Sequence, residues 1–208
     1  MITVVPIVEG DGEVGALPAL LHRIGARLSP GTVFKVNTPI RVKRDQFLRN
    51  RDDRFDKVLQ FAASKGRESG WILILLDADD DCPKALGEKI LQQARQVVPY
   101  CAISVVLANC EIEAWFIAAA ASLHGECGLA VGGKPLPDDP ETIRNAKGWL
   151  SEHMPNGSYK EVRDQPLLSR QMNLKQAWDR SRSFRKLCTE WHRQMPSTSQ
   201  DILTFFQE

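Results

Sequence analysis

Short apolar runs alternate along the first part of the chain with longer segments whose apolar residues recur at helical spacing. The runs that predict buried strands occupy residues 2–8, 32–37, 71–76 and 102–107. The segments that predict helices occupy residues 13–28, 54–65, 83–98 and 111–123. Because strand and helix alternate throughout, the pattern predicts an α/β fold in which a four-stranded parallel sheet lies between helices.

The pattern changes after residue 124. Residues 125–140 are rich in Gly, Pro and Asp and predict a long loop. Short helical patterns follow at residues 140–153, 166–173, 174–179 and 183–194. We therefore expect residues 1–124 to form the sheet domain, and residues 125–208 to form a loop and a small helical cap packed on it.

Composition narrows the classes of function. The 208 residues are 43% hydrophobic and 25% charged, as in an ordinary globular protein, and the formal net charge is +1, so any basic surface must be local. The chain starts with a strand pattern, and no apolar run approaches the roughly 20 residues of a membrane span. The odd number of cysteines and the absence of a CxxC pair are typical of reduced thiols. These features predict a cytoplasmic protein with no membrane segment.

Acidic residues follow directly after two of the predicted strands, and a third acidic pair lies at the start of the helix that follows the strand at residues 102–107. They are Glu9, Asp77, Asp79, Glu111 and Glu113. The carboxyl ends of parallel strands meet at one edge of a sheet, so we expect these side chains to converge. Because strand side chains alternate, we expect Asp77 and Asp79 to project to the same side. Crowded carboxylates repel each other and are hard oxygen ligands, which predicts a Mg²⁺ or Mn²⁺ site.

A simpler explanation covers part of this set. Glu13 and Glu111 fall in the first turn of predicted helices, where the helix dipole favours a negative charge. Asp77 and Asp79 end a strand, so the dipole does not explain them. Asp81 is expected to cap the helix that begins at Pro83, and Asp80 is left open between a ligand and a cap.

Glycine and basic residues are the candidates for phosphate binding. Gly10 and Gly12 would let the backbone turn tightly beside a phosphate. The basic stretch at residues 41–44 suits either nucleic-acid phosphates or a solvated surface, and the acids interleaved after it favour the solvated surface. Arg182 and Arg185 either dock the cap or clamp a phosphate.

Two lysines of the cap are candidates for a catalytic cation. Lys147 or Lys160 would stabilise negative charge on a scissile phosphate. Ala146 and Trp149 indicate that the helix carrying Lys147 packs on the core, so Lys147 is the preferred candidate. The tryptophans fall at helical positions and are expected in the core.

Four pieces of the chain together resemble a known group of proteins. They are residues 8–13, 75–81, 109–116 and 181–185. Glu9 with the Asp77-Ala78-Asp79 sequence resembles the Toprim signature of topoisomerases, bacterial primases, ribonuclease M-five-type maturases and overcoming-lysogenization-defect (OLD) nucleases. The longer pattern resembles a narrower Toprim-like group, the domain-of-unknown-function family 4276.

The resemblance implies roles for individual residues. It implies a Toprim-like fold in which Glu9 binds metal or shuttles a proton and Asp77 and Asp79 hold Mg²⁺. The OLD-type nucleases imply that Glu111 or Glu113 helps to hold a second metal. Members of the narrower group look like partners of neighbouring ATPases in bacterial defence.

We therefore expect a Mg²⁺-dependent phosphodiesterase of the nuclease type, acting on DNA or RNA. The only tyrosines are Tyr100 and Tyr159, with no DNA-gate domains around them, so we do not expect a topoisomerase. The supporting domains of a primase are missing as well. The alternatives are a non-catalytic Toprim-like subunit of an ATPase complex, or an enzyme acting on a small nucleotide.

Overall fold

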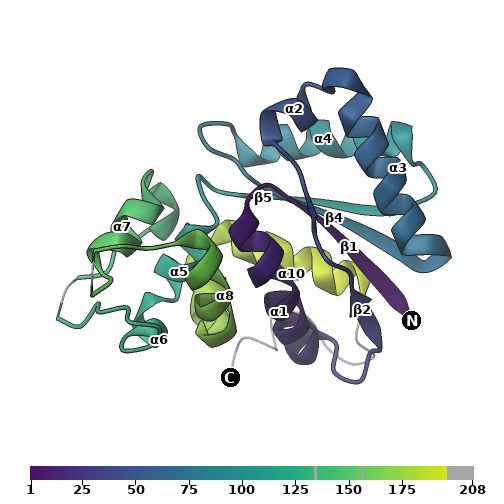
Figure 1. Cartoon of the computed structure of the whole chain (residues 1–208). Helices are drawn as coiled ribbons and strands as arrows, with labels where there is room; N and C mark the ends of the chain where they lie inside the picture. The colour runs from purple at the N-terminus through teal and green to yellow at the C-terminus, as the bar shows by residue number, and fades with distance from the viewer. Residues whose placement is uncertain (134, 156, 196–208) are drawn as a thin grey trace.

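A parallel sheet with the strand order β2-β1-β4-β5 forms the centre of the molecule (Figure 1). The computed structural model describes residues 1–133, 135–155 and 157–195. The longer strands are β1 (Ile2–Val8), β2 (Phe34–Val36), β4 (Gly70–Asp77) and β5 (Ala102–Ala108). A further strand, β3 (Ile40–Arg41), pairs with the last two residues of β1, so the sheet has five strands and the expectation of four was wrong. The sequence pattern missed β3 because two residues are too short to show a period.

Helices cover both faces of the sheet. One face is covered by α2 (Arg44–Leu48), α3 (Arg54–Gly66) and α4 (Pro83–Val97), drawn above the sheet in Figure 1. The other face is covered by α1 (Asp11–Leu28) and α10 (Arg182–Gln194), and α8 (Glu161–Gln171) packs along α1. Neighbouring strand residues alternate between these two layers: Val5, Ile7, Ile72 and Ile74 join the first, and Val4, Val8, Leu73 and Leu75 the second. Burial on both faces explains why the strands are continuously apolar.

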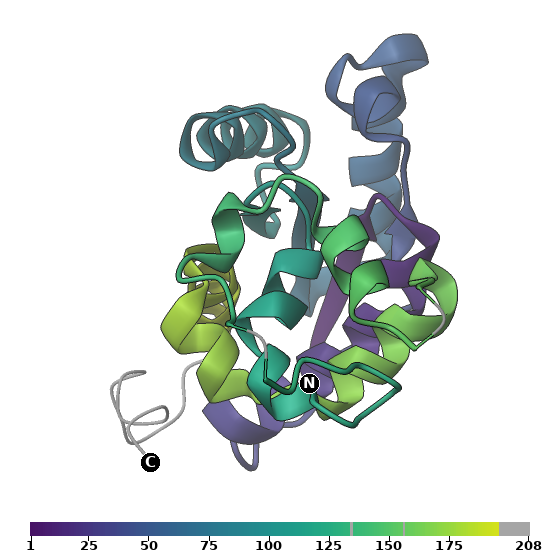
Figure 2. The same cartoon turned by 90° about the vertical axis from the view of Figure 1, so that its left-hand side faces the viewer.

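The carboxyl ends of the strands are covered by the middle of the chain. This part contains α5 (Glu113–Ala118), α6 (Ala120–Leu123), α7 (Ala146–Glu152), the start of α8, and α9 (Leu174–Arg180). Figure 2 faces this end and shows the teal and green segments in front of the strands. Three short 3-10 segments, Arg51–Asp53, Arg67–Ser69 and Pro140–Thr142, complete the described elements.

The last helix belongs to a layer of the sheet. The Trp191 ring of α10 lies edge-on to Trp71 of β4, with ring centroids 5.7 Å apart, and to Phe34 of β2 at 4.9 Å. Ser104 of β5 donates a 2.6 Å hydrogen bond to Glu190. The expected cap therefore includes a helix that closes one face of the sheet, and one apolar cluster runs from β1 to α10.

Helix boundaries differ from expectation at two places. The segment expected at residues 111–123 is two helices, because the chain leaves the α-helical conformation at Ala119. The helix expected from Pro166 begins at Glu161 and contains this proline in its interior. Within the described residues, no helix combines the length and apolar character needed to cross a membrane. All five cysteines are free thiols.

Candidate metal and phosphate site

The sheet brings the acidic residues that follow β1, β4 and β5 to one edge. β1 and β4 are neighbours, with Ile7 opposite Ile74, and Asp77 lies opposite Ala108 of β5. Glu9, Asp77 and the Glu111–Glu113 turn therefore lie at the same carboxyl edge. This adjacency was the geometric premise of the predicted site.

Asp77 faces the layer of α1 and α5. Its Oδ1 atom accepts a 2.9 Å hydrogen bond from the backbone N–H of Ile112. Burial raises the pKa of Asp77 well above its ordinary value, and the charges of Glu113 and Glu13 raise it further. Asp77 thus lies among other carboxylates on the α1 side of the sheet.

Asp79 turns to the opposite side. Its backbone has a φ of +50°, and its carboxylate lies 3.3 Å from Arg44 Nη1 of α2. The left-handed conformation ends the alternation of β4, so the expectation that Asp77 and Asp79 share one side was wrong. Burial raises the pKa of Glu9, and the negative charge of Asp79 raises it further, which indicates that these two carboxylates are close.

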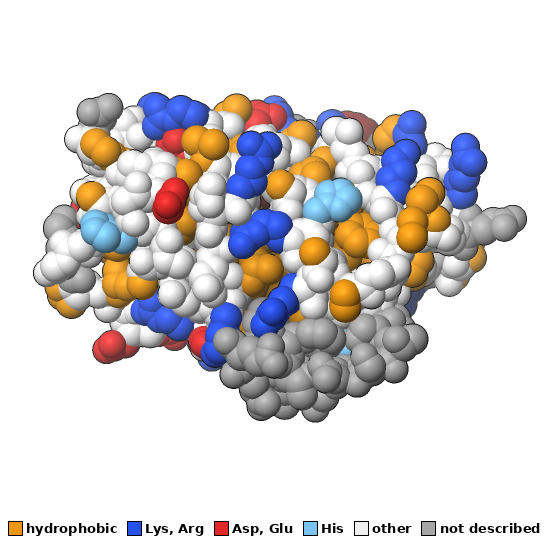
Figure 3. Space-filling view, turned by 90° about the horizontal axis from the view of Figure 1, so that it is seen from below, with side chains coloured by type: hydrophobic (Ala, Val, Ile, Leu, Met, Phe, Trp, Pro, Cys, Tyr) orange, Lys and Arg blue, Asp and Glu red, His pale blue; other side chains and the backbone are white. Residues whose placement is uncertain are grey.

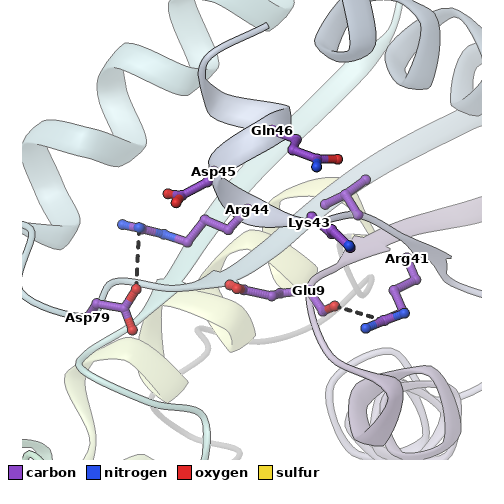
Figure 4. Close-up of a pocket in the computed structure, with 8 residues that line it drawn as sticks. Glu9, Arg41, Lys43, Arg44, Asp45, Gln46 and Asp79 are labelled. Carbon is purple, nitrogen blue, oxygen red and sulfur yellow. Dashed lines mark hydrogen bonds and ion pairs between the residues drawn. The ribbon is translucent and has the colours of Figure 1, made fainter. Parts of the chain in front are cut away.

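Glu9 and Asp79 share an open cavity of about 450 Å³ (Figure 4). Its remaining lining comes from the segment that runs from the end of β3 into α2, with the charged residues Arg41, Lys43, Arg44 and Asp45. The Glu9 carboxylate points toward the side where Asp79 and Arg44 meet. Glu9 Oε2 is buried and has no hydrogen-bond partner among the described residues. Such an oxygen is available as an acceptor for a proton, an ordered water or a cation.

Glu113 forms the inner part of the carboxylate group. Its side chain is fully buried, and Oε1 accepts hydrogen bonds from Tyr159 Oη at 3.1 Å and from Gln165 Nε2 at 2.8 Å. Within the described part of the chain, Oε2 has no partner. Burial raises the pKa of Glu113 to about 7, although the positive charge of Lys147 opposes this.

Glu13 belongs to the same group, which the sequence did not indicate. Its carboxylate is buried and accepts a hydrogen bond from the backbone N–H of Gly10. Burial raises its pKa, and its charge in turn raises the pKa values of Glu9 and Asp77. The helix dipole favours an acid at this position whether or not the side chain is buried, so it does not explain why Glu13 is buried. No local pattern marked Glu13 as a site residue, because Glu9 precedes α1 and the spacing rule for pairs within a helix does not apply to it.

Lys147 is the cation that faces this group. Its Nζ atom lies 3.0 Å from Glu161 Oε1 and 4.0 Å from Glu111 Oε1, and its charge lowers the pKa of Glu9, Glu13, Asp77 and Glu113. Burial alone would lower the pKa of Lys147, but the surrounding carboxylates raise it overall, so the lysine stays charged. The Lys147 backbone N–H also donates to Glu111 Oε2 at 3.2 Å. The side chain of Lys160, the other candidate, is not among these charges.

The comparisons with known proteins give a family. A family model described as a domain of unknown function, DUF4276, matches residues 8–191. The chain belongs to the DUF4276 family. The matched region of this DUF4276 chain begins at the last residue of β1 and ends within α10, so it contains each candidate site residue. No curated protein and no solved structure matches the chain.

Four further candidates of the DUF4276 chain lie outside the cavity lining. A Cβ atom on Gly12 would lie 2.3 Å from Gln165 Oε1, so packing of α1 against α8 accounts for this glycine. Gly10 donates its backbone N–H to Glu13. Arg182 lies 3.6 Å from both Asp139 and Glu141. Arg185 Nη1 donates to the carbonyl oxygens of residues 178 and 179, at 2.6 and 3.0 Å, and so ties α10 to the end of α9.

Asp80 and Asp81 form ion pairs. Asp81 binds Arg44, while the residue that caps α4 is Cys82, which makes no side-chain cap bond. The expected cap at Asp81 was therefore wrong, because Arg44 draws its carboxylate toward α2. Asp80 pairs with Arg144 at 2.5 Å, on the exposed surface.

The carboxylate oxygens of this DUF4276 chain are the kind of donor that a hard cation prefers, but their present positions do not form a ready set of ligands. Among the described residues, no group of three or more His, Cys, Asp or Glu side chains is arranged to hold a metal ion. The buried oxygens of Glu9 and Glu113 that lack a partner are open to a cation, and a cation at Glu113 would have to displace a proton near neutral pH, because the pKa of this carboxyl is about 7.

Proposed function

We propose that the chain is a metal-dependent phosphodiesterase of the nuclease type, with a Toprim-like arrangement of acids, that cleaves DNA or RNA. The observation that carries the proposal is the meeting of carboxylates from β1, β4 and α5 at the carboxyl edge of the sheet, with unpartnered buried oxygens on Glu9 and Glu113. A purely structural role would leave each buried carboxylate oxygen partnered, whereas Glu9 Oε2 and Glu113 Oε2 have no partner among the described residues.

The residues divide into two groups around the edge. Glu9 and Asp79 line the open cavity and are the proposed ligands there. Asp77, Glu111 and Glu113 lie deeper, facing Lys147, and are the proposed ligands of a second ion. A bound Mg²⁺ or Mn²⁺ ion would polarise a phosphoryl oxygen and lower the pKa of a coordinated water.

The chain's own residues would move the proton and stabilise the charge. In the proposed hydrolysis, a water oxygen forms a bond to phosphorus and the ester P–O bond breaks. As the alternative to its role as a ligand, the Glu9 carboxylate takes the proton of the water and passes it to the departing ester oxygen. The raised pKa of Glu9 suits this role, because it brings the basicity of the carboxylate closer to that of a general base. Lys147 would stabilise the negative charge that develops on the phosphoryl oxygens.

A non-catalytic subunit is the second candidate, favoured by two observations. Arg44 already neutralises Asp79 and Asp81, and the described acids do not form a ready set of three ligands. An ATPase as the partner of such a subunit is a proposal that rests on the sequence resemblance.

Purified protein incubated with Mn²⁺ or Mg²⁺ tests the two candidates. The substrates are plasmid DNA, single-stranded DNA and RNA, and the small diester bis(4-nitrophenyl) phosphate. We expect cleavage that EDTA abolishes and that Glu9→Gln and Asp79→Asn remove. Asp179→Asn is the matched control, because Asp179 is an exposed acid paired with Lys175 on α9. If no substrate is cleaved with either ion, the phosphodiesterase proposal fails and the subunit remains.

A further inference from the structure

A short basic segment crosses the carboxyl end of β1. We call Arg41, Lys43 and Arg44 the basic strap; they run from β3 into α2. Its backbone is fixed to β1, because Arg41 pairs with Val8 and the Val42 N–H donates to the Val8 carbonyl at 2.8 Å. The strap therefore has a fixed position directly beside Glu9.

Two side chains of the strap are anchored and one is free. Arg44 is largely buried and binds the Ala78 carbonyl and Asp79, each at 3.3 Å, while its buried Nε atom has no partner in the described structure. Arg41 Nε lies 3.2 Å from the Glu9 carbonyl oxygen and 3.1 Å from Asp11. The exposed Lys43 makes no side-chain hydrogen bond or ion pair with the described residues.

The charges of the cavity balance only while it is empty. Its lining has three acids, Glu9, Asp45 and Asp79, against the three bases of the strap. A divalent cation bound by the acids would leave an excess of positive charge. A phosphate group would neutralise this excess, and its oxygens would accept hydrogen bonds from the N–H groups of the strap that have no partner.

We propose that the basic strap is a subsite for the phosphate next to the cleaved one in a nucleic-acid strand. This inference rests on the proposed function and names its substrate as a polyanion. Successive phosphates of one strand would occupy the acidic and the basic walls of the same cavity, whereas a monophosphate would use only one wall. Figure 3 shows Lys and Arg side chains scattered over another face of the molecule, so basic residues alone do not single out the strap. The cavity shared with Glu9 and Asp79 does.

Binding measured without cleavage tests this subsite separately from catalysis. Labelled single-stranded DNA, double-stranded DNA and single-stranded RNA of about 20 nucleotides are titrated in EDTA and in Ca²⁺, over a series of KCl concentrations. We expect Lys43→Ala to weaken binding about 3- to 10-fold near 50 mM KCl and to reduce the slope of log K against log [KCl] by about 0.7–0.9. Lys43→Arg should keep both values.

The matched control is Lys35→Ala. Lys35 is an exposed lysine of β2, which lies on the same side of β1 as β3. The variant therefore loses the same charge, but at a position away from the cavity. The subsite is overturned if both alanine variants change the slope equally, or if the native protein binds none of the three nucleic acids. With an active enzyme, Lys43→Ala should raise KM by a larger factor for nucleic acid than for bis(4-nitrophenyl) phosphate, and equal factors would count against the subsite. If binding depends on Lys43 but no cleavage is seen, the strap is supported as a phosphate-binding site and only the phosphodiesterase proposal is refuted.

Discussion

The backbone N–H of Ile112 donates a 2.9 Å hydrogen bond to Asp77 Oδ1, which joins the end of β4 to the residue before α5. One carboxylate thus has a structural and a proposed chemical role. Its other oxygen remains in the repulsive field of Glu113 and Glu13. The two roles are separable, because an amide side chain keeps the acceptor and removes the charge.

Two substitutions at Asp77 should therefore have different effects. Asp77→Ala leaves the Ile112 N–H without its acceptor, which costs about 1–3 kcal/mol of unfolding free energy. Asp77→Asn keeps the bond and removes repulsion, so we expect it to be at least as stable as the native protein near pH 8. Both should lower metal-dependent cleavage by more than the roughly 10–100-fold that loss of a residue supporting a metal ligand costs. Urea unfolding and cleavage rates measure these effects, and full activity in Asp77→Asn would exclude Asp77 as a ligand.

Glu113 should make the stability of the metal-free protein depend on pH. Its pKa is about 7 in the folded protein against an ordinary 4.5, so the folded state binds more protons between these values. The unfolding free energy should then fall as the pH rises from about 4.5 to 7, by up to about 3 kcal/mol, and level off above that window. We expect Glu113→Gln to reduce this fall, because an amide keeps Oε1 as an acceptor and has no proton to lose. The part of the fall that comes from Asp77, Glu9 and Glu13, whose pKa values are also raised, should remain. Urea titrations in EDTA at several pH values measure it, and parallel curves for the two proteins would contradict the assignment.

Lys147 should oppose cation binding and support catalysis. Since its charge faces Glu9, Glu13, Asp77 and Glu113, a bound cation must compete with it. We expect Lys147→Met to bind Mn²⁺ several-fold more tightly while cleaving about 100-fold more slowly. Calorimetric titration and cleavage assays give the two values. Lys175→Met, which removes an exposed partner of Asp179, should change neither.

The sequence was a good guide to the sheet and to the edge where the acids meet, for a physical reason. Strands buried on both faces are continuously apolar, and the first polar residue after such a run marks the carboxyl end. Because both faces are buried, these strands lack the alternation of apolar and polar residues that would show which face each side chain takes. Glu9 lies two residues after Ile7 and points to the same face, toward α2. Asp77 lies two residues after Leu75 and points to the other face, toward α1. This difference appears only once the strand register is known.

The other residues that contact the site acids had no sequence signal of their own. Glu13 lies in a first helical turn, where an acid is common, and Arg44 lies in a stretch with interleaved acids, which favoured a solvated surface. Gln165 of α8 and Tyr159, just before α8, reach Glu113 through the packing of α8 along α1, a tertiary contact that no local pattern encodes. The positive φ of Asp79 likewise depends on the turn between β4 and α4.

Gly12 tests whether the packing of α1 against α8 holds the carboxylate group in place. A Cβ atom there would displace Gln165, which is fully buried and bonded to Glu113, so the side chain has no free space to move into. We expect Gly12→Ala to cost about 1–3 kcal/mol of unfolding free energy and to weaken Mn²⁺ binding. Gly87→Ala is the matched control within α4, where the nearest atom to the new Cβ, Val105 Cγ1, is 3.9 Å away. The control should gain about 0.5–1 kcal/mol, because alanine favours a helix more than glycine does. Equal stabilities of the two variants would mean that Gln165 yields without cost, and that the contact between α1 and α8 does not position Glu113.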